Sequence, residues 1–281
     1  MAKTAKKAAK KGAGGSKAPA KKTPAAKAAR PLAKRISKPV SKKQVKTSPA
    51  KSPSAKRPAP KAARKPIPLA PDPQRFTLYG SMLSGPTYTV GLMLSLCKYP
   101  FSYIHVNLRE GQHKQPDYLV KNRYGQVPSL RDGQSYYVQS AAIIEHLAES
   151  LGKFDGKTPY EWHRIREWLF WQWDKLALPI FRLRARVRGL RQFGDEVRTM
   201  YDTEARAALA VLENELGRSD WVAAKRPTVA DIGCYAVIRY APEANIDLTP
   251  YPHVGEWKKR FEALPGFGTP EQILPMESRL L

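Results

Sequence analysis

The chain divides near residue 74 into two stretches of opposite character, and this division most limits what the protein can fold into. Residues 1–74 contain 22 lysines and arginines, twelve prolines and a single acidic residue, and they contain no Phe, Trp or Tyr. A segment with so little apolar surface cannot bury enough of it to offset the entropy lost on folding. We therefore predict a disordered basic tail and linker over residues 1–74, with the hydrophobic core formed by residues 75–281.

The charge of the predicted tail indicates a polyanionic partner. Dense lysines on a flexible chain displace counterions from a phosphate backbone, which gives sequence-independent and salt-sensitive binding. The composition resembles that of the Lys/Ala/Pro-rich tails of linker histones and of histone-like bacterial proteins, and residues 48–51 (SPAK) match their Ser-Pro-x-Lys unit. We expect the tail to bind nucleic acid or another polyanion. DNA, RNA and an acidic membrane surface stay open as partners, and a merely solubilising tail is the alternative.

Residues 75–281 have the composition of an ordinary globular chain, with 27 basic and 23 acidic residues. The two cysteines, Cys97 and Cys234, fall in apolar stretches with helical spacing, and two cysteines cannot staple about 200 residues. No apolar run is long enough to span a bilayer, and no metal-ligand spacing or phosphate-binding Gly-rich loop occurs. We therefore expect a metal-free protein without a membrane span in a reduced compartment, either cytoplasmic or associated with the nucleoid or nucleus.

The first part of the globular stretch predicts a strand, a helix and a second strand. Residues 75–80 (RFTLYG) and 101–108 (FSYIHVNL) alternate in the manner of strands. Between them, apolar residues recur at three- and four-residue spacing. Because Pro86 is acceptable only in the first turn of a helix, the helix should begin near residues 84–85. Two strands joined by such a crossover should be parallel.

The next residues predict a hairpin followed by a helix. Asp132-Gly133 is a two-residue turn signal between the short strands SLR and QSYYV, and Ser140 is placed to cap the helix of SAAIIEHLAES. Pro128 stands where a strand begins, a position at which proline can carry a cis peptide bond in a tight turn. The predicted order is therefore β-α-β-(α)-β-β-α.

From Pro159 onward the pattern is helical throughout. Tryptophans and aliphatic residues form one stripe of YEWHRIREWLFWQWDKLALP, which we assign first to the core or a dimer interface, and second to a pocket for an apolar co-substrate. Pro179 should kink or end this helix. Residues 182–191 (RLRARVRGLR) form a basic run, expected to be a solvated face or an extension of the binding surface of the tail. Thr228 and Asp231 have the spacing of a helix capping pair ahead of an apolar run.

Four motifs, in this order, resemble those of cytosolic glutathione transferases of the serine type, bacterial and theta-like: LYG…SGPTYTV, GQH, GQVPSL and QSAAIIEHL. The resemblance extends from residue 75 to about 270 and includes the Thr228/Asp231 pair, which nucleates a buried helix in that family. It implies a thioredoxin-like, glutathione-binding α/β domain at residues 75–152, followed by an all-α domain at residues 158–270. It also implies a homodimer with its active site in the cleft between the two domains.

In serine-type members, the serine that opens the first helix donates a hydrogen bond to the sulfur of glutathione, and the matching residue is Ser84. A hydroxyl donor at the positive end of a helix favours the thiolate over the thiol. Ser84 could instead be only a helix cap, although Thr87 does not complete a capping box. The basic residue that members often carry shortly after this motif is missing here, and Tyr88 is a possible second contributor at the thiol.

The resemblance also implies residues that bind the remainder of glutathione. In Val127–Pro128 the valine would pair main chain to main chain with the cysteinyl unit, next to the predicted cis bond. Gln139 and Ser140 would hold the γ-glutamyl carboxylate at a helix N-terminus. Gln126 and His113 would reach the glycyl end of the ligand.

Two functions follow from these features. The first is a glutathione S-transferase that uses glutathione as co-substrate against an apolar electrophile or a disulfide, with aromatic residues of the helical domain selecting the substrate. The second is a non-catalytic dimeric scaffold of the same fold, tethered to DNA or RNA by residues 1–74. Scaffolds of this type often lose the glutathione-site residues. Here Ser84 and the residue pairs 127–128 and 139–140 are present, which favours the transferase.

Overall fold

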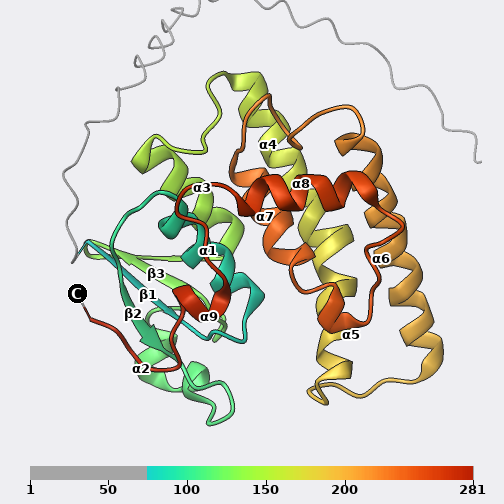
Figure 1. Cartoon of the computed structure of the whole chain (residues 1–281). Helices are drawn as coiled ribbons and strands as arrows, with labels where there is room; N and C mark the ends of the chain where they lie inside the picture. The colour runs from blue at the N-terminus through green and yellow to red at the C-terminus, as the bar shows by residue number, and fades with distance from the viewer. Residues whose placement is uncertain (1–74, 281) are drawn as a thin grey trace, which may run out of the picture. The chain divides into compact units, whose positions relative to one another are not determined.

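The computed structural model describes residues 75–280, so the predicted tail lies outside the described residues. The first half is a four-stranded sheet with helices: β1 (Phe76–Gly80), α1 (Gly85–Leu96), β2 (Ser102–His105), η1 (Gln112–Lys114), α2 (Pro116–Leu119), β3 (Ser129–Asp132), β4 (Ser135–Val138) and α3 (Ser140–Leu151). The strand order is β2-β1-β3-β4, with β1 and β2 parallel and the other neighbours antiparallel. This arrangement, at the left of Figure 1, confirms the predicted thioredoxin-like α/β fold.

Helix α1 begins where the sequence predicts. Ser84 is its N-cap, with Oγ accepting a hydrogen bond from the backbone N–H of Thr87 at 3.2 Å. Pro86 lies in the first turn, where no backbone donor is needed. The helix packs against both α3 and α7, and most of its side chains are buried. It therefore joins the sheet to the helical half of the molecule.

The hairpin between β3 and β4 closes one residue later than predicted. Asp132 pairs with Ser135, so the two-residue loop is Gly133–Gln134, and the glycine has a φ of +59° that suits its lack of a Cβ atom. Asp132 stays in the strand, where its carboxylate accepts hydrogen bonds from the Arg75 guanidinium at 2.9 and 3.1 Å. The same carboxylate lies 2.9 Å from Nε2 of His146. Asp132, predicted as a turn residue, therefore forms a structural ion pair with Arg75 instead.

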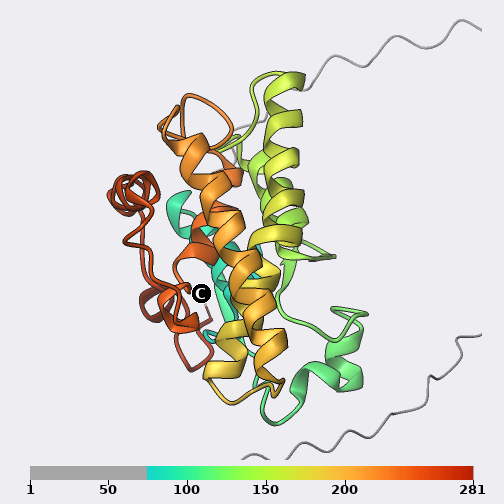
Figure 2. The same cartoon turned by 90° about the vertical axis from the view of Figure 1, so that its right-hand side faces the viewer.

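The second half is all helix, as predicted: α4 (Pro159–Trp171), the π-helical turn η2 (Gln172–Ala177), α5 (Leu178–Val187), α6 (Asp195–Leu216), α7 (Val229–Ile238), η3 (Pro242–Ala244), α8 (Pro252–Glu262) and α9 (Pro270–Ile273). Figure 2 shows the long α6 running alongside the segment formed by α4, η2 and α5. Within the described part of the chain, no helix is both long and apolar enough to cross a membrane.

The long helical segment does not end at Pro179. The backbone changes to a π-helical turn immediately before α5, and Pro179 follows as the second residue of that helix. The disturbance predicted at this proline is therefore a change of helical type, which is a common cause of local distortion in long helices. Ile165, Trp168 and Leu169 are buried, so the predicted stripe is mostly core.

Helix α7 is the buried centre of the helical half, and its start confirms the predicted capping pair. Thr228 and Asp231 form a complete capping box. The fully buried Asp231 carboxylate accepts hydrogen bonds from the backbone N–H groups of Val222 and Thr228, at 3.0 and 2.9 Å, and from Nε1 of Trp257 at 3.1 Å. Burial raises the pKa of Asp231 to about 6, against these hydrogen bonds, which lower it.

After α9 the chain returns to the sheet. Arg279 pairs with Tyr103 of β2 through two backbone hydrogen bonds, at 2.6 and 2.7 Å. The Arg279 guanidinium also lies over the ring of Phe101, 5.4 Å from its centroid. This pairing covers part of the outer edge of β2, which would otherwise present unpaired backbone groups.

Candidate functional site

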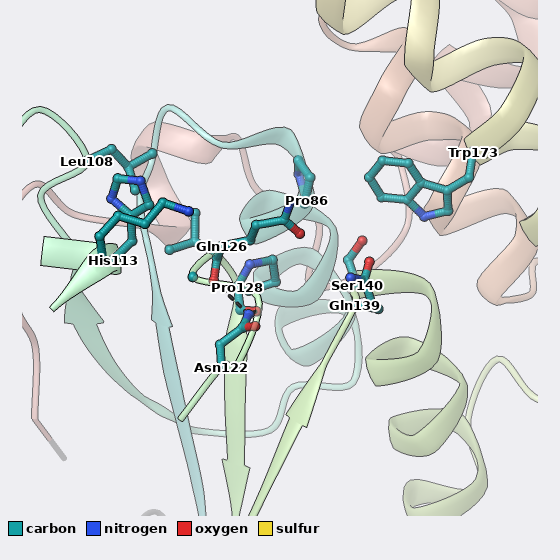
Figure 3. A pocket seen from close by; sticks show the side chains of 12 residues that line it. Pro86, Leu108, His113, Asn122, Gln126, Pro128, Gln139, Ser140 and Trp173 are labelled. Atoms are coloured by element: carbon teal, nitrogen blue, oxygen red, sulfur yellow. Dashed lines mark hydrogen bonds between the residues drawn. The ribbon is translucent and has the colours of Figure 1, made fainter. Parts of the chain in front are cut away.

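A cavity of about 540 Å³ lies beside the N-termini of α1 and α3 (Figure 3). Eleven of its lining residues come from the first half of the described chain, and Trp173 of η2 comes from the second half: Pro86, Leu108, His113, Lys114, Asn122, Gly125, Gln126, Val127, Pro128, Gln139, Ser140 and Trp173. The structure thus brings together six of the eight residues singled out in the sequence: His113, Gln126, Val127, Pro128, Gln139 and Ser140. Ser84 and Tyr88 do not line this cavity.

The N-terminus of α3 lies at the cavity without a side-chain cap. Ser140, predicted as a possible cap, is instead the first helical residue, and Gln139 takes the cap position with a φ of 68° and a ψ of 110°. A residue with a Cβ atom is strained in this region, and such strain is concentrated at functional sites. No side chain accepts a hydrogen bond from the first turn. Its backbone donors and the positive end of the helix dipole are therefore available to an anionic group in the cavity.

The loop before β3 holds the backbone of Val127 at the cavity wall. The Val127–Pro128 peptide bond is cis, as predicted. The buried Asn122 side chain donates to the carbonyl oxygens of Gln126 and Pro128, at 2.6 and 3.1 Å, and Tyr118 Oη donates to the Gln126 carbonyl at 2.8 Å. Over residues 75–280, neither the N–H nor the C=O of Val127 has a hydrogen-bond partner, so both can pair with an extended, peptide-like ligand.

The other side of the cavity carries positive charge. In Figure 3, His113 lies across the cavity from Gln139, Ser140 and Trp173, and Lys114 lines the cavity beside it. Burial and, secondarily, Lys114 lower the pKa of His113, so its imidazole is neutral at pH 7. Its buried Nδ1 has no hydrogen-bond partner within the described residues. The Lys114 ammonium, which was not predicted, and the His113 ring can serve an anionic group here.

Ser84 is a helix cap, and its hydroxyl keeps a hydrogen to donate. The Oγ accepts from the Thr87 N–H, which occupies one of its lone pairs. Among residues 75–280 no acceptor takes the hydroxyl hydrogen, and the side chain is half-buried. Pro86, two residues further along, lines the cavity. The capping role and the donor role are therefore compatible.

Tyr88, predicted as a possible second contributor at the thiol, lies in the core and outside the cavity lining. Its side chain is fully buried, and its hydroxyl donates to the backbone carbonyl of Gly268 at 2.9 Å. Burial raises the pKa of Tyr88 far above its usual range. Its ring contacts that of Tyr240, at 6.2 Å between centroids, so this turn of α1 faces the helical half and the segment after α8.

Two residues of α5 support the loop before α1. The Arg184 guanidinium donates to the Leu83 carbonyl at 2.9 Å and lies 3.9 Å from the Tyr240 ring centroid. Phe181 covers Gly85, where an added Cβ would lie 2.5 Å from Phe181 Cζ, so only glycine fits without rearrangement. The predicted solvated basic face therefore needs correction, because Arg184 is only 8% exposed. Nothing in the sequence indicated that Arg184 would be buried, because its neighbours in this run include four other arginines.

Together these groups suit a ligand with a peptide-like middle and an anionic group at each end. The uncapped start of α3 faces one end, the Val127 backbone the middle, and His113 with Lys114 the other end. A hydroxyl at a helix N-terminus can stabilise a thiolate. Over the residues that the structure describes, no group of three or more His, Cys, Asp or Glu side chains could hold a metal ion.

In a comparison with known proteins, both halves of the fold match domains of the same family. Residues 78–153 match the glutathione S-transferase N-terminal domain, and residues 181–265 match the glutathione S-transferase C-terminal domain. The chain is 26% identical over 188 residues to the disulfide-bond oxidoreductase YfcG of Escherichia coli (strain K12), a match that covers 64% of this chain and 87% of that protein.

Two further relatives agree. Glutathione S-transferase theta-1 of Bos taurus is 26% identical over 211 residues, covering 67% of this chain and 83% of that protein. The crystal structure of a possible glutathione S-transferase from Rhodopseudomonas palustris is similar with a TM-score of 0.67 at 31% identity, covering 70% of this chain and 90% of that one. With both domains matched in the order of the fold, and this likeness over most of a related chain, the protein belongs to the glutathione S-transferase family.

Proposed function

We propose that the protein is a serine-type glutathione transferase in which Ser84 donates a hydrogen bond to the sulfur of glutathione, its co-substrate. The hydroxyl and the N-terminus of α1 would lower the pKa of the thiol. The thiolate attacks an electrophilic carbon, the S–C bond forms as the bond to the leaving group breaks, and the leaving group departs with the electron pair. With a disulfide substrate, the S–S bond breaks instead, giving a mixed disulfide with glutathione and a released thiolate.

The observation that carries this proposal is a set of unpaired polar groups, two of them in the wall of one cavity and the third, at Ser84, two residues before Pro86 of that wall. The hydroxyl hydrogen of Ser84, the main chain of Val127 and the uncapped first turn at Ser140 have no protein partner among the described residues. Polar groups left unpaired in a folded protein call for a ligand or water. Glutathione supplies a thiol, a peptide-like middle and a carboxylate at each end, and so offers a partner to each group.

Each part of glutathione is assigned to one part of the cavity. The γ-glutamyl carboxylate would lie at the N-terminus of α3, with Gln139 and Ser140. The cysteinyl main chain would pair with Val127, in the turn set by Pro128. The glycyl carboxylate would lie near His113 and Gln126, and the charge of Lys114 supports this orientation.

The decisive experiment is calorimetry of glutathione binding to the full chain and to two serine variants of α3. We expect binding in the micromolar-to-millimolar range. Ser140→Ala should weaken it about tenfold through loss of a hydrogen bond to a charged group. Ser150→Ala, at the far end of the same helix, is the matched control and should bind as the wild type does.

Turnover then tests Ser84. Ser84→Ala should still bind glutathione but lower kcat/KM about 100-fold, because a rise of about two units in the thiol pKa corresponds to about 2.7 kcal/mol. Unchanged turnover would remove Ser84 from the thiol. If the full chain bound no glutathione at all, the non-catalytic scaffold would become the better explanation.

We further propose a homodimer that is cytoplasmic or associated with the nucleoid or nucleus, and whose residues 1–74, outside the described residues, bind nucleic acid or another polyanion. The composition of the tail supports this, since its lysines should release counterions from a phosphate backbone. A chain lacking residues 1–74 should keep glutathione binding and lose salt-sensitive affinity for DNA and RNA. Affinity that survived the deletion would rule out the tail as the tether.

A further inference from the structure

A second, smaller hollow of about 190 Å³ adjoins the cavity at Trp173, which lines both. In Figure 3 the Trp173 ring extends toward Pro86 and lies above Ser140 and Gln139. The remaining walls come from the end of η2, from α5 and from Arg191, and no acidic side chain lines the hollow. The hollow therefore lies next to the cavity, with Trp173 as the wall that they share.

One wall of the hollow is aromatic and reaches the start of α1. The rings of Trp173 and Phe181 lie edge to face, with centroids 6.4 Å apart. Phe181 also packs on Gly85, the residue next to Ser84. A flat apolar group held against these rings would therefore lie close to the sulfur position that the proposed function assigns to glutathione.

The hollow also carries positive charge, which comes from two arginines that lack ion-pair partners among the described residues. Three of the five arginines in residues 182–191 pair with carboxylates: Arg184 with Glu243 at 2.8 Å, Arg186 with Asp195 at 3.1 Å and Arg188 with Glu243 at 3.4 Å. The other two, Arg182 and Arg191, line the hollow, and neither forms an ion pair within residues 75–280. The unpaired charge of this segment is thus concentrated at the hollow.

We propose that the electrophilic substrate carries an anionic group, held by Arg182 and Arg191, on an apolar body that stacks on Trp173 and Phe181. The inference rests on the proposed transferase function and refines the apolar electrophile expected from the sequence. A guanidinium offers a planar fork of donors that matches a carboxylate in two parallel hydrogen bonds. The neighbouring rings exclude water on one side, which strengthens the attraction between unlike charges.

A matched pair of electrophiles tests this assignment: a chlorodinitrobenzoate with its carboxylate para to the chlorine, and the methyl ester of the same acid. In both, the glutathione sulfur bonds to the carbon that carries chlorine, chloride leaves with the electron pair of the broken C–Cl bond, and the thiol proton passes to solvent. The two substrates share the reacting ring and leaving group, and the group that the arginines would meet is a carboxylate in one and a neutral ester in the other.

The full chain should favour the carboxylate over the ester in kcat/KM, after correction for their uncatalysed rates with glutathione. The double variant Arg182→Gln/Arg191→Gln should lose roughly ten- to a hundredfold for the carboxylate, the range typical of hydrogen bonds to charged groups, and should keep its activity toward the ester. Arg206→Gln, which removes a charge paired with Asp202 on α6, is the control and should leave both substrates unaffected.

The outcomes separate this inference from the proposed function. Turnover of both substrates with no change in the double variant would overturn the inference and leave the transferase standing. If neither substrate is turned over, binding of the benzoate to the full chain is measured by quenching of tryptophan fluorescence. Weaker binding in the double variant would support the anion site without catalysis, and unchanged binding would overturn it.

Discussion

Two helices of this protein begin in opposite ways. At the start of α7, Thr228 and Asp231 close a capping box inside the core, and the carboxylate of Asp231 accepts three hydrogen bonds from N–H groups. At the start of α3, no side chain caps the first turn, and Gln139 holds a backbone conformation that disfavours a Cβ atom. A helix start completed by its own side chains contributes to folding, whereas an incomplete one is suited to an anionic ligand.

The largest effect on stability should come from removing the capping box at the start of α7. Asp231→Ala would leave the backbone donors of Val222 and Thr228 and the indole of Trp257 buried without an acceptor. Each such donor costs about 1–3 kcal/mol, so the free energy of unfolding in urea should fall by about 3–5 kcal/mol. Asp202→Ala, in an exposed pair with Arg206, should cost less than about 1 kcal/mol. Equal losses in the two variants would contradict a structural role for the capping box.

A second prediction concerns the charge of the same carboxylate. Because the pKa of Asp231 rises from 3.8 to about 6 on folding, the folded state binds more protons than the unfolded state between these values. Its contribution to stability is present below the lower pKa and is lost as the pH rises through the higher one. The difference in unfolding free energy between the wild type and Asp231→Asn should therefore shift against the wild type from about pH 4 to about pH 6. A difference independent of pH would show that the pKa is not raised.

A smaller effect on stability is expected from a substitution at the start of α3. Gln139→Gly relieves a φ of 68°, so it should raise the free energy of unfolding by up to about 1 kcal/mol. Glutathione affinity should fall at the same time, since the glutamine is proposed to contact the ligand. Lys98→Gly, at a φ of 52° and outside the cavity lining, is the control and should change stability without changing affinity. Unchanged glutathione affinity in Gln139→Gly would show that neither the side chain of Gln139 nor its strained backbone contributes to binding.

The features predicted correctly are those decided within a few residues. Pro86 fixes the start of α1, the residue before Pro128 takes part in a cis bond, and the Thr228/Asp231 spacing closes a capping box. In each case the partners are neighbours in the chain, so the pattern contains the physical cause. The sequence motifs likewise predicted six residues that gather at one cavity, since their loops follow one another around the sheet.

The features missed or mistaken depend on partners far along the chain. Tyr88 was expected at the thiol, but its hydroxyl is taken by Gly268, 180 residues away. Arg184 was expected in solvent, but Leu83 and Tyr240 hold it. Trp173 belongs to a stripe that was assigned first to the core and second to a pocket, and it lines the cavity. Helical spacing assigns a side chain to a face, but it cannot say which element covers that face.

The π turn η2 acts like a single residue inserted into one long helix. Successive residues of an α-helix are rotated by about 100°, so everything after such an insertion is out of phase with what precedes it by roughly that angle. Ile165 and Leu169 belong to the first phase and face the core, while Phe181 and Arg182 belong to the second and face the hollow. Deleting one residue within 174–177 would therefore redirect Phe181 and Arg182, two of the side chains proposed to select the substrate, without altering either of them.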